Sequence, residues 1–314
     1  MRTLVIGRGL LGGAVVRRSA GTAESADHVP WSTPDAAVEH LRDTVRAHTT
    51  QPGWRIAWCA GSGTVGSHQA ALDTETSFLE AVLDAVTPGS GDGSKFVLVS
   101  SAGGIHAAGT PEWIDEAAPP APRSPYGFNK LRQEDLTRDW AARVGADLLI
   151  ARPSNLFGPG QRLGKPQGLV SQVLYRTLRR QPITISVAEE TQRDYVYVDD
   201  AAGWILRWIT QPPHGRVDTK IVCAGRSVTI AHLLRVVRAA TGVEPRIVRR
   251  ATAASTLQPR HLRYRSTVHR ELDAPVRTLE AGIALTWADL LARFAAGELA
   301  AHDRPTSPRG TLSA

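Results

Sequence analysis

Tyr126 and Lys130 are the residues of this chain best suited to proton-transfer chemistry, and they lie four positions apart. A tyrosine hydroxyl has a pKa of about 10, so at neutral pH it is a poor base unless its phenolate is stabilised. An ammonium group one helical turn away, near the positive end of the helix dipole, provides that stabilisation. Tyr126 can then take a proton from an alcohol or give one to a ketone. The alternative is a solvated tyrosine and lysine on an amphipathic helix.

The element that must position this pair is a helix that begins after Ser124. Serine is a favourable N-cap and Pro125 suits the first helical turn, so the sequence predicts a helix from there to about Val144. In that helix Tyr126 and Lys130 share one face.

A glycine-rich loop is the second feature with a chemical use. Residues 3–6 are predicted to form a buried strand, and a helix is predicted from about residue 10 to residue 19. The loop between them can hold the pyrophosphate of a dinucleotide at the helix N-terminus, and the alternative is a tight turn without a ligand. The residues expected to bind the cofactor here are Gly7, Arg8, Gly9, Leu10, Leu11 and Gly12.

The cofactor preference is predicted from the second strand, expected at about residues 28–31. An acid that binds the adenosine ribose is expected about 20 residues beyond the loop, and Ser32 occupies that place. Without a carboxylate there, a 2′-phosphate is not repelled, and Arg8 can pair with it. The sequence therefore predicts NADP or NAD as the cofactor, with NADP favoured.

Two later strands are predicted to end in small residues. The strand at residues 55–60 leads into a loop in which Ala60 and Gly61 fit beneath a cofactor, and a helix is expected at residues 74–86. The strand at residues 96–99 delivers two serines, of which Ser101 is preferred to Ser100 as the donor to a reacting oxygen. Either serine can also be a simple turn residue. Residues 111–125, rich in proline, are predicted to form a loop over the site.

The composition is that of an ordinary globular protein, with 42% hydrophobic and 21% charged residues in a chain of 314. The net charge of +7 comes from scattered arginines without a nucleic-acid-binding motif, so we expect no nucleic-acid partner and consider an anionic small substrate. Cys59 and Cys223 lie in apolar runs without metal-ligand partners, so we expect buried thiols and no metal. No apolar run is long enough for a signal peptide or a membrane span, and we expect a cytoplasmic protein without a membrane partner.

Five stretches of this chain together resemble the extended short-chain dehydrogenases/reductases of the NAD-dependent epimerase/dehydratase type, which act on nucleotide-diphosphate sugars. The stretch Arg-Asp-Tyr-Val-Tyr-Val-Asp-Asp is the most specific of them. In family order they are residues 7–12, 99–102, 124–130, 152–160 and 192–200.

The resemblance implies a catalytic triad of Ser101, Tyr126 and Lys130, with Lys130 also holding the ribose of the cofactor. It implies that Pro153 lies near the nicotinamide and that Asn155 and Arg193 contact the diphosphate of the substrate. A guanidinium fork matches a phosphate well, whereas the alternative for Arg193 is a surface ion pair with Asp194. Arg265 is a further candidate ligand of the diphosphate from its position in the sequence alone.

The chain also departs from the pattern it resembles. Dehydratases of this type carry an Asp-Glu pair directly after the hydroxyl residue, and Ala102 and Gly103 stand there, so dehydration is not expected. Ile105 and His106 stand where this family often has Tyr-Gly, a few residues after the serine. The details of the sugar pocket therefore cannot be carried over from the family. We expect no catalytic role for His106.

The predicted fold is α/β, a Rossmann-type doubly wound parallel sheet with a smaller C-terminal substrate domain. Residues 1–160 are expected to form the NAD(P)-binding domain, with part of its sheet completed by later segments. Residues 161–300 are expected to bind mainly substrate, with residues 169–180 and 182–185 bordering the nucleotide base, and residues 301–314 to form a tail.

The predicted activity is that of an NAD(P)-dependent oxidoreductase or epimerase of a nucleotide-diphosphate sugar, with a keto-sugar reductase preferred. One alternative is an epimerase that holds its NAD tightly. Another is a reductase of a non-nucleotide ketone or aldehyde, against which Asn155 and Arg193 argue. A cofactor-sensing protein without turnover ranks last, because it needs no intact catalytic set. We also expect a homodimer.

Overall fold

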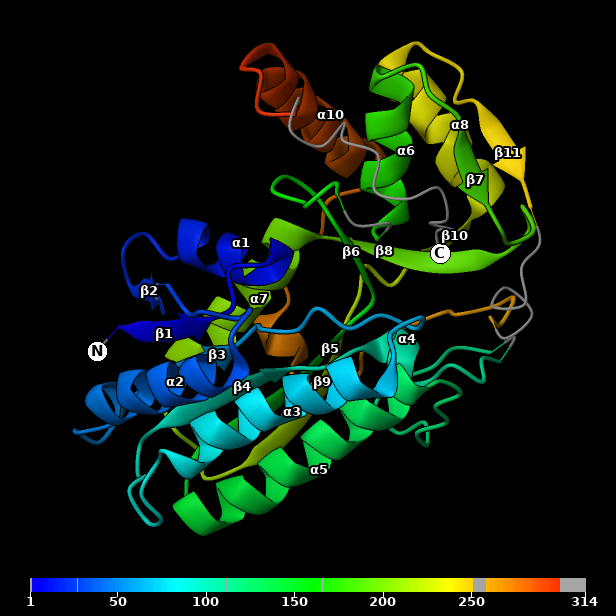
Figure 1. Cartoon of the computed structure of the whole chain (residues 1–314). Coiled ribbons are helices and arrows are strands. Elements are labelled where there is room, and N and C mark those ends of the chain that lie inside the picture. The colour runs from blue at the N-terminus through cyan, green and yellow to red at the C-terminus, as the bar shows by residue number, and fades with distance from the viewer. Residues whose placement is uncertain (1, 27, 111, 165–166, 251–257, 300–314) are drawn as a thin grey trace.

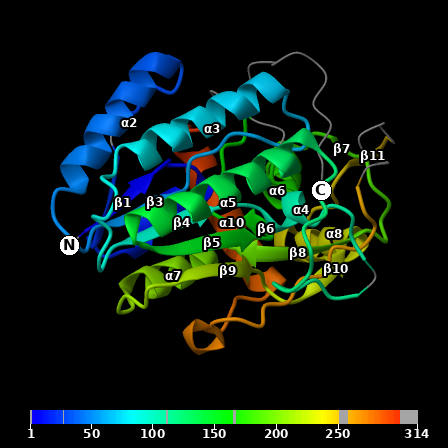
Figure 2. The ribbon, with the colours of Figure 1, turned by 90° about the horizontal axis from the view of Figure 1, so that it is seen from below.

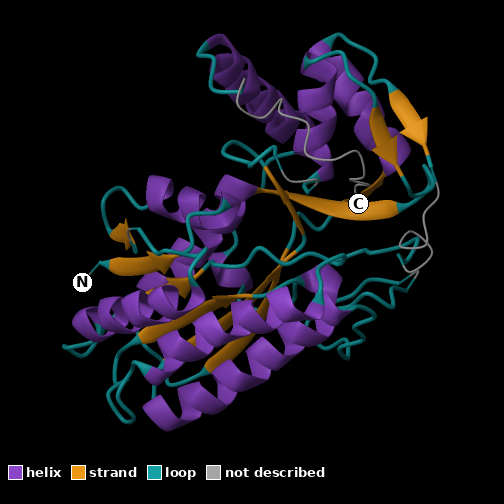
Figure 3. Cartoon of the chain, in the orientation of Figure 1, coloured by secondary structure: helices purple, strands orange, loops and turns teal. Residues whose placement is uncertain are grey.

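The computed structural model describes residues 2–26, 28–110, 112–164, 167–250 and 258–299. Helices and strands alternate along much of the chain, and helices flank a central sheet (Figure 3). The predicted α/β class and the doubly wound parallel sheet are confirmed. Within the described ranges, no helix combines the length and the apolar character that crossing a membrane requires.

Six parallel strands form the central sheet, in the order β2-β1-β3-β4-β5-β9. β9 comes from far along the chain and pairs with β5, so a late segment completes the sheet. The strands are β1 (Thr3–Ile6), β2 (Ala23–Ser25), β3 (Arg55–Trp58), β4 (Lys95–Val99), β5 (Asp147–Pro153) and β9 (Val217–Val222).

Alternating side chains of these strands feed two separate hydrophobic cores. Ile6, Ile56 and Phe96 point to the face covered by α2 (Pro34–His48), α3 (Gln69–Asp84) and α5 (Pro125–Val144). Val5 and Val97 point to the opposite face, which α1 (Leu10–Arg18) and α7 (Val198–Thr210) cover. Figure 2 shows α2, α3 and α5 side by side along one face of the sheet. This period-two burial on both faces is what a sheet between two helical layers requires.

The strand order fixes where a ligand can bind. The chain reverses its direction of winding between β1 and β3, and ligands of open α/β sheets bind in the crevice outside the carboxyl ends of the strands at such a point. The glycine loop follows β1, and the loop of Ala60 and Gly61 follows β3. Both predicted cofactor-binding segments therefore meet at this edge of the sheet.

Later segments form a second group of elements with its own hydrophobic core. Figure 1 shows α6, α8, α10, β7 and β11 gathered apart from the six-stranded sheet. Beside them runs a three-stranded ribbon, in which β8 pairs in parallel with β6 and antiparallel with β10. The elements are β6 (Asn155–Phe157), α6 (Leu169–Leu178), β7 (Ile183–Ile185), β8 (Gln192–Tyr197), β10 (Ser227–Thr229), α8 (Ile230–Thr241), β11 (Ile247–Arg249), η1 (Arg270–Leu272) and α10 (Leu279–Ala295). The predicted tail at residues 301–314 lies outside the described residues.

The predicted position of the second strand is wrong. The strand is not at residues 28–31 but at Ala23–Ser25, where Thr3 pairs with Ala23 and Val5 with Ser25. Ala20 and Gly21 both have positive φ, so a tight turn after α1 returns the chain to the sheet at once. Ser32 is exposed, in the turn before α2, and does not end this strand.

Candidate active site

Tyr126 lies in the first turn of α5, between the loops that follow β3 and β4. Ser124 caps this helix as predicted, its Oγ accepting the backbone N–H of Gly127 at 3.2 Å. A Cβ added to Gly104 would lie 2.9 Å from Cε1 of Tyr126, and one added to Gly63 would lie 3.3 Å from Cδ2. The two glycines thus leave the room that the ring occupies.

Ser101 rather than Ser100 accompanies the tyrosine. Ser100 is buried and its hydroxyl donates to Oε1 of Glu134 at 2.6 Å, so it is committed to the interior. Ser101 is half-buried and is the N-cap of a short helix, α4 (Ala102–Ile105), that the sequence did not predict. A Cβ on Gly104 would lie 3.4 Å from Cβ of Ser101 as well as close to Tyr126. The structure therefore brings Ser101 and Tyr126 to the same glycine.

Lys130 is buried one turn along α5, with Nζ 5.8 Å from the ring centroid of Tyr126. Its ammonium group donates to Oε1 of Glu75 at 2.7 Å and to Oε1 of Gln133 at 3.0 Å. Burial opposes the charge of the lysine, but Glu75, Tyr126 and Glu134 together outweigh burial, and the pKa of Lys130 is raised. Lys130 thus remains an ammonium group beside Tyr126, as the predicted chemistry requires.

Glu75 is the site residue that the sequence analysis missed. Burial opposes its charge as well, but Lys130 and the backbone N–H groups of Ser62 and Gly63 together outweigh burial, and the pKa of Glu75 is lowered. The sequence does contain a signal, because Glu75 falls on the same helical stripe as Leu72, Leu79 and Val82, all of them buried. A carboxylate in an apolar stripe needs a buried partner.

The glycine loop has the shape that a pyrophosphate requires. A Cβ on Gly7 would overlap the backbone of Ala60, and a Cβ on Gly12 would overlap the carbonyl oxygen of Gly7. A Cβ on Gly9, the N-cap of α1, would meet nothing within 4 Å. The loop is therefore packed tightly against the β3 loop on one side and open at the helix N-terminus, where an anion is stabilised. These residues fit the dinucleotide that the sequence predicts.

The other predicted cofactor-binding residues differ in how far they are exposed to solvent. Arg8 is exposed, Leu10 is half-buried, and Leu11 is buried in the core between the sheet and α7. A Cβ on Gly61 would lie 3.1 Å from Oε1 of Glu75. Pro153 is buried at the carboxyl end of β5, where it pairs with Val222.

Ser100 belongs to a network of buried charges. Glu134 accepts Nε of Arg152 at 2.9 Å and Nη2 at 2.6 Å, in addition to Ser100. Arg152 also contacts Nε2 of His106 at 3.3 Å. Because an arginine only donates, Nε2 of His106 must accept, and the ring is neutral with its other nitrogen donating to the carbonyl of Pro119. His106 is thus buried at the end of α4 and bonded to Arg152 and Pro119.

We expect the free energy of unfolding to fall at acidic pH, because His106 is protonated more readily in the unfolded chain. Burial and the adjacent Arg152 lower the pKa of His106 to about 4. The unfolded chain takes up this proton below about pH 6.5 and the folded chain does not, so stability falls as the pH falls from there to about 4. We expect a loss of up to about 3 kcal/mol, measured by urea unfolding across this range.

His106→Gln should flatten this part of the pH dependence, because glutamine accepts from Arg152 without titrating. His48, whose pKa burial also lowers, is present in both proteins, so the difference between them isolates His106. His232→Gln, at a partly exposed position, is the matched control. Parallel curves for wild type and His106→Gln would contradict the expectation.

The predicted substrate residues lie on the ribbon of β6 and β8. Asn155 donates from Nδ2 to the carbonyl of Asp194 at 2.9 Å. Arg193 is only 1% exposed and donates to the carbonyls of Gln192 and Pro259 at 2.8 and 2.9 Å. It does not form the surface pair with Asp194, which instead accepts Ser154 and backbone N–H groups. The cause is the segment beginning at residue 258, which pairs with Gln192 and covers the arginine.

Arg265 is exposed and pairs with Asp115, Nη2 to Oδ2 at 2.9 Å. This pair ties the proline-rich loop to the later segment, and the backbone bonds between Ile114 and residues 263 and 265 do the same. Glu116 adds bonds to Ile221, Ser266 and Thr267. The loop that we expected over the site is therefore anchored along residues 114–116. Residue 111, where its expected range begins, lies outside the described residues.

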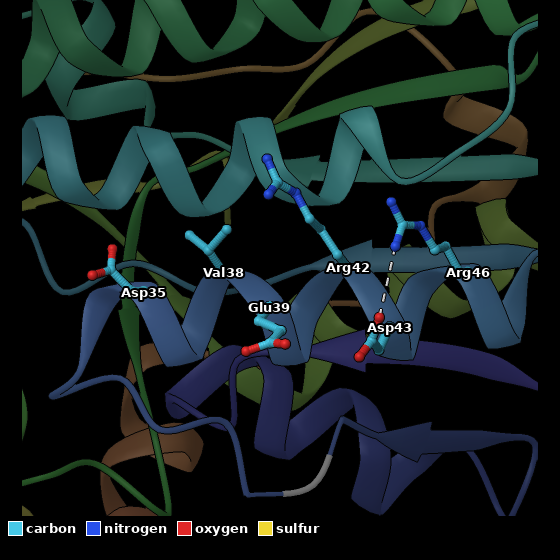
Figure 4. Close-up of a pocket in the computed structure, with 6 residues that line it drawn as sticks. All are labelled: Asp35, Val38, Glu39, Arg42, Asp43 and Arg46. Carbon is cyan, nitrogen blue, oxygen red and sulfur yellow. Dashed lines mark ion pairs between the residues drawn. The ribbon is translucent and has the colours of Figure 1, made fainter.

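A surface hollow lies away from these residues. This hollow of about 450 Å³ lies at α2 and is lined by residues of that one helix, among them Arg42 and Arg46, whose side chains are drawn in Figure 4. It contains none of the residues around Tyr126. Within the described part of the chain, no three His, Cys, Asp or Glu side chains gather closely enough to hold a metal ion.

The sequence of this chain matches a known protein family. The model of the NAD dependent epimerase/dehydratase family matches residues 40–224. The chain belongs to this family. The match includes Ser101, Tyr126 and Lys130 and begins after the glycine loop. Members of this family among the curated relatives are named as epimerases, reductases and dehydratases of nucleotide-linked sugars.

Curated relatives include both epimerases and reductases of this family. The dTDP-L-rhamnose 4-epimerase of Burkholderia thailandensis is 32% identical over 132 residues, 41% of this chain and 36% of that protein. The GDP-6-deoxy-D-mannose reductase of Pseudomonas aeruginosa is 29% identical over 173 residues, 54% of this chain and 56% of that protein. Dehydratases occur among the relatives as well. The matched stretches span about a third to just over half of the length of these two relatives.

Solved structures of the family share the fold over nearly the whole chain. The UDP-glucose 4-epimerase of Thermotoga maritima, solved with UDP-glucose, has a TM-score of 0.76 at 22% identity, covering 94% of this chain and 100% of its own. RMD from Pseudomonas aeruginosa, solved with NADPH, has a TM-score of 0.69 at 21% identity, covering 93% and 100%. These likenesses extend the family fold to the glycine loop, which the family model does not reach.

Proposed function

We propose that this chain is an NAD(P)-dependent reductase of a keto sugar carried on a nucleoside diphosphate. One observation carries the proposal. The ring of Tyr126 lies between Gly63 and Gly104 with Ser101 beside it and the charged Lys130 one turn away, next to the open glycine loop. These are the parts that proton transfer to a carbonyl beside a dinucleotide requires.

In the proposed reaction the protein residues handle the substrate oxygen. The hydroxyls of Ser101 and Tyr126 donate hydrogen bonds to the carbonyl oxygen. Tyr126 then transfers its proton to that oxygen, and the ammonium of Lys130 stabilises the phenolate that remains. The nicotinamide cofactor, when bound, supplies the hydride to the carbonyl carbon. The products are a sugar alcohol and the oxidised cofactor.

We propose that the diphosphate of the substrate binds near Arg193 and Asn155, with Arg265 as a further ligand. Arg193 now donates to two neutral carbonyls, and a phosphate oxygen is a stronger acceptor for a guanidinium. Tyr195 and Tyr264 are both close enough to Arg193 to interact electrostatically with its guanidinium. Within the described part of the chain, their buried hydroxyls have no hydrogen-bond partner. Such groups are suited to bind the oxygens of a ligand.

We also propose a broader organisation of the chain. Residues 1–160 bind the cofactor, residues 161–300 bind mainly the substrate, and two copies associate as a homodimer. The preference for reduction over dehydration is supported by Ala102 and Gly103, which supply no carboxylate beside Ser101. The preference over epimerisation is supported by the reductase relative, whose match covers more of this chain than that of the epimerase.

A stoichiometry measurement tests the proposed reaction. A reductase consumes one reduced cofactor per product, so purified protein should carry no nicotinamide absorbance and should oxidise added NADPH or NADH in step with the product formed. Nucleotide-linked keto sugars on UDP, dTDP and GDP form the substrate panel. Stoichiometric NAD in the isolated protein, with sugars interconverted and no net consumption of cofactor, would identify an epimerase instead.

The preference for NADP over NAD depends on Arg8, which is exposed at the open end of the glycine loop. Ser32 does not stand at the end of the second strand, because β2 ends at Ser25. Asp27 follows that end by two positions in the sequence and lies outside the described residues. A carboxylate after this strand typically binds the ribose of NAD. Arg8 and Asp27 therefore favour opposite cofactors.

Arg8→Ala should weaken NADPH binding by about 10- to 100-fold, because a charge-assisted hydrogen bond contributes about 1.5–3 kcal/mol. NADH binding should change little, since NADH lacks the 2′-phosphate. Fluorescence titration of both cofactors against wild type and variant measures the effect. Equal affinities for the two cofactors in wild type, or the same losses for both in the variant, would exclude the proposed preference.

A further inference from the structure

Glu75 is a buried carboxylate to which the proposed reaction assigns no step. Its side chain is 7% exposed, and its two oxygens bind different parts of the site. Oε1 accepts Nζ of Lys130 at 2.7 Å, while Oε2 accepts the backbone N–H groups of Ser62 and Gly63 at 2.9 and 3.0 Å. One carboxylate on α3 therefore joins the lysine of α5 to the loop after β3.

We propose that Glu75 is a positioning residue of the cofactor site, which holds the ammonium of Lys130 and the loop after β3 as one unit. The inference rests on the proposed function, because it assumes that this lysine and this loop meet the nicotinamide cofactor. Glu75 itself performs no chemical step. It acts through Lys130.

The hydrogen bonds around Lys130 determine its orientation. An ammonium group has three N–H donors, and Glu75 and Gln133 accept two of them. Gln133 is held in turn by Thr76, whose Oγ1 accepts Nε2 at 3.1 Å. Both acceptors are thus fixed by α3, and one N–H of Lys130 remains for a ribose hydroxyl. Without Glu75 the ammonium can rotate and lose this alignment.

The charges around Lys130 determine its protonation. The groups that act on it are Glu75 from α3 and Tyr126 and Glu134 from α5, and the loop after β3 contributes no titratable side chain at residues 60–63. Glu134 is already paired with Arg152. Burial disfavours the charged lysine, so with a neutral residue at position 75 Lys130 should lose its proton at a lower pH.

The alternative is that Glu75 and Lys130 form an ion pair that serves only the fold. A structural pair affects unfolding, and its loss weakens cofactor binding to the same extent at every pH. A positioning role makes cofactor binding follow the protonation of Lys130. The pH dependence of binding therefore separates the two.

The test is the affinity for NADH or NADPH, whichever wild type binds more tightly, titrated by nicotinamide fluorescence from about pH 7 to about pH 10 without substrate. In Glu75→Gln the affinity should begin to fall at least one pH unit below wild type, giving a difference of about tenfold or more in the upper part of the range. Glu75→Asp keeps the charge and should show the wild-type pH profile with weaker binding throughout. The aspartate side chain is too short to reach both Lys130 and the loop after β3.

Thr286→Val is the control, because Thr286 is as buried as Glu75 and its hydroxyl donates to the carbonyl of Gly282 within its own helix α10. It should keep the wild-type pH profile. A Glu75→Gln profile parallel to wild type would overturn the inference and leave the proposed function standing. Should Glu75→Gln not fold, wild-type affinity in Glu75→Asp would overturn it equally. A wild-type protein that binds neither cofactor would overturn the inference and the proposed function together.

Discussion

Tyr126→Phe should lower the turnover rate by about 10²–10⁴-fold and leave the fold and cofactor binding nearly unchanged, because a general acid typically contributes that factor. The ring that remains still fills the space between Gly63 and Gly104, and the helical propensities of tyrosine and phenylalanine are similar. No hydrogen bond of the tyrosine hydroxyl holds the described structure together. The loss should therefore fall on the rate of the chemical step.

Turnover, cofactor affinity and thermal unfolding of the variant measure this expectation. Tyr197→Phe is the matched control, since Tyr197 is buried against Phe157 and Arg277 and has no proposed part in the reaction. It should retain wild-type turnover. If Tyr126→Phe turned over its substrate at the wild-type rate, another residue would have to carry the proton. A variant that failed to unfold cooperatively would instead indicate a structural role for the hydroxyl.

The helix that carries Tyr126 was predicted correctly because its signals are local. Ser124 and Pro125 set its start, and Gly145, with a φ of 82°, ends it in the left-handed conformation. Each of these signals depends on one or two neighbouring residues. The same holds for the glycine loop, where the overlaps at Gly7 and Gly12 explain why no other residue fits.

The second strand was misplaced because nothing local identifies it. Ala23–Ser25 is a three-residue edge strand without an apolar alternation, and only its pairing with β1 defines it. The apolar residues at positions 29–31 look more like a strand, but the turn at Ala20 and Gly21 has already returned the chain to the sheet. A pairing partner cannot be read from so short a segment.

The buried charges were missed for a related reason. Lys130 and Glu75 are 55 positions apart, so the pair exists only once α3 and α5 pack together. Arg193 likewise finds a partner far along the chain, the carbonyl of Pro259, 66 positions away. Residue types and spacing indicate which groups can react. Which partner each buried charge finds is decided by tertiary packing.

Gly9→Ala should abolish most cofactor binding and leave the protein folded. A methyl group at Gly9 meets no atom within 4 Å, and the backbone there, with φ of −74°, suits alanine. The added methyl instead occupies the space where a pyrophosphate must approach the loop. We expect the affinity for NADH and NADPH to fall by at least about 10-fold, the effect of losing about 1.4 kcal/mol of binding free energy. Fluorescence titration measures it.

Gly12→Ala is the informative comparison, because its methyl group would overlap the carbonyl oxygen of Gly7 within the folded protein itself. This variant should lose about 1–3 kcal/mol of folding free energy or more, the usual cost of overpacking a close contact. Gly9→Ala should lose much less, since it changes only the N-cap residue of α1. Gly9→Ala thus tests whether the loop binds the cofactor, and Gly12→Ala tests whether the fold requires a glycine there. Full cofactor affinity in Gly9→Ala would show that the pyrophosphate does not lie at this loop.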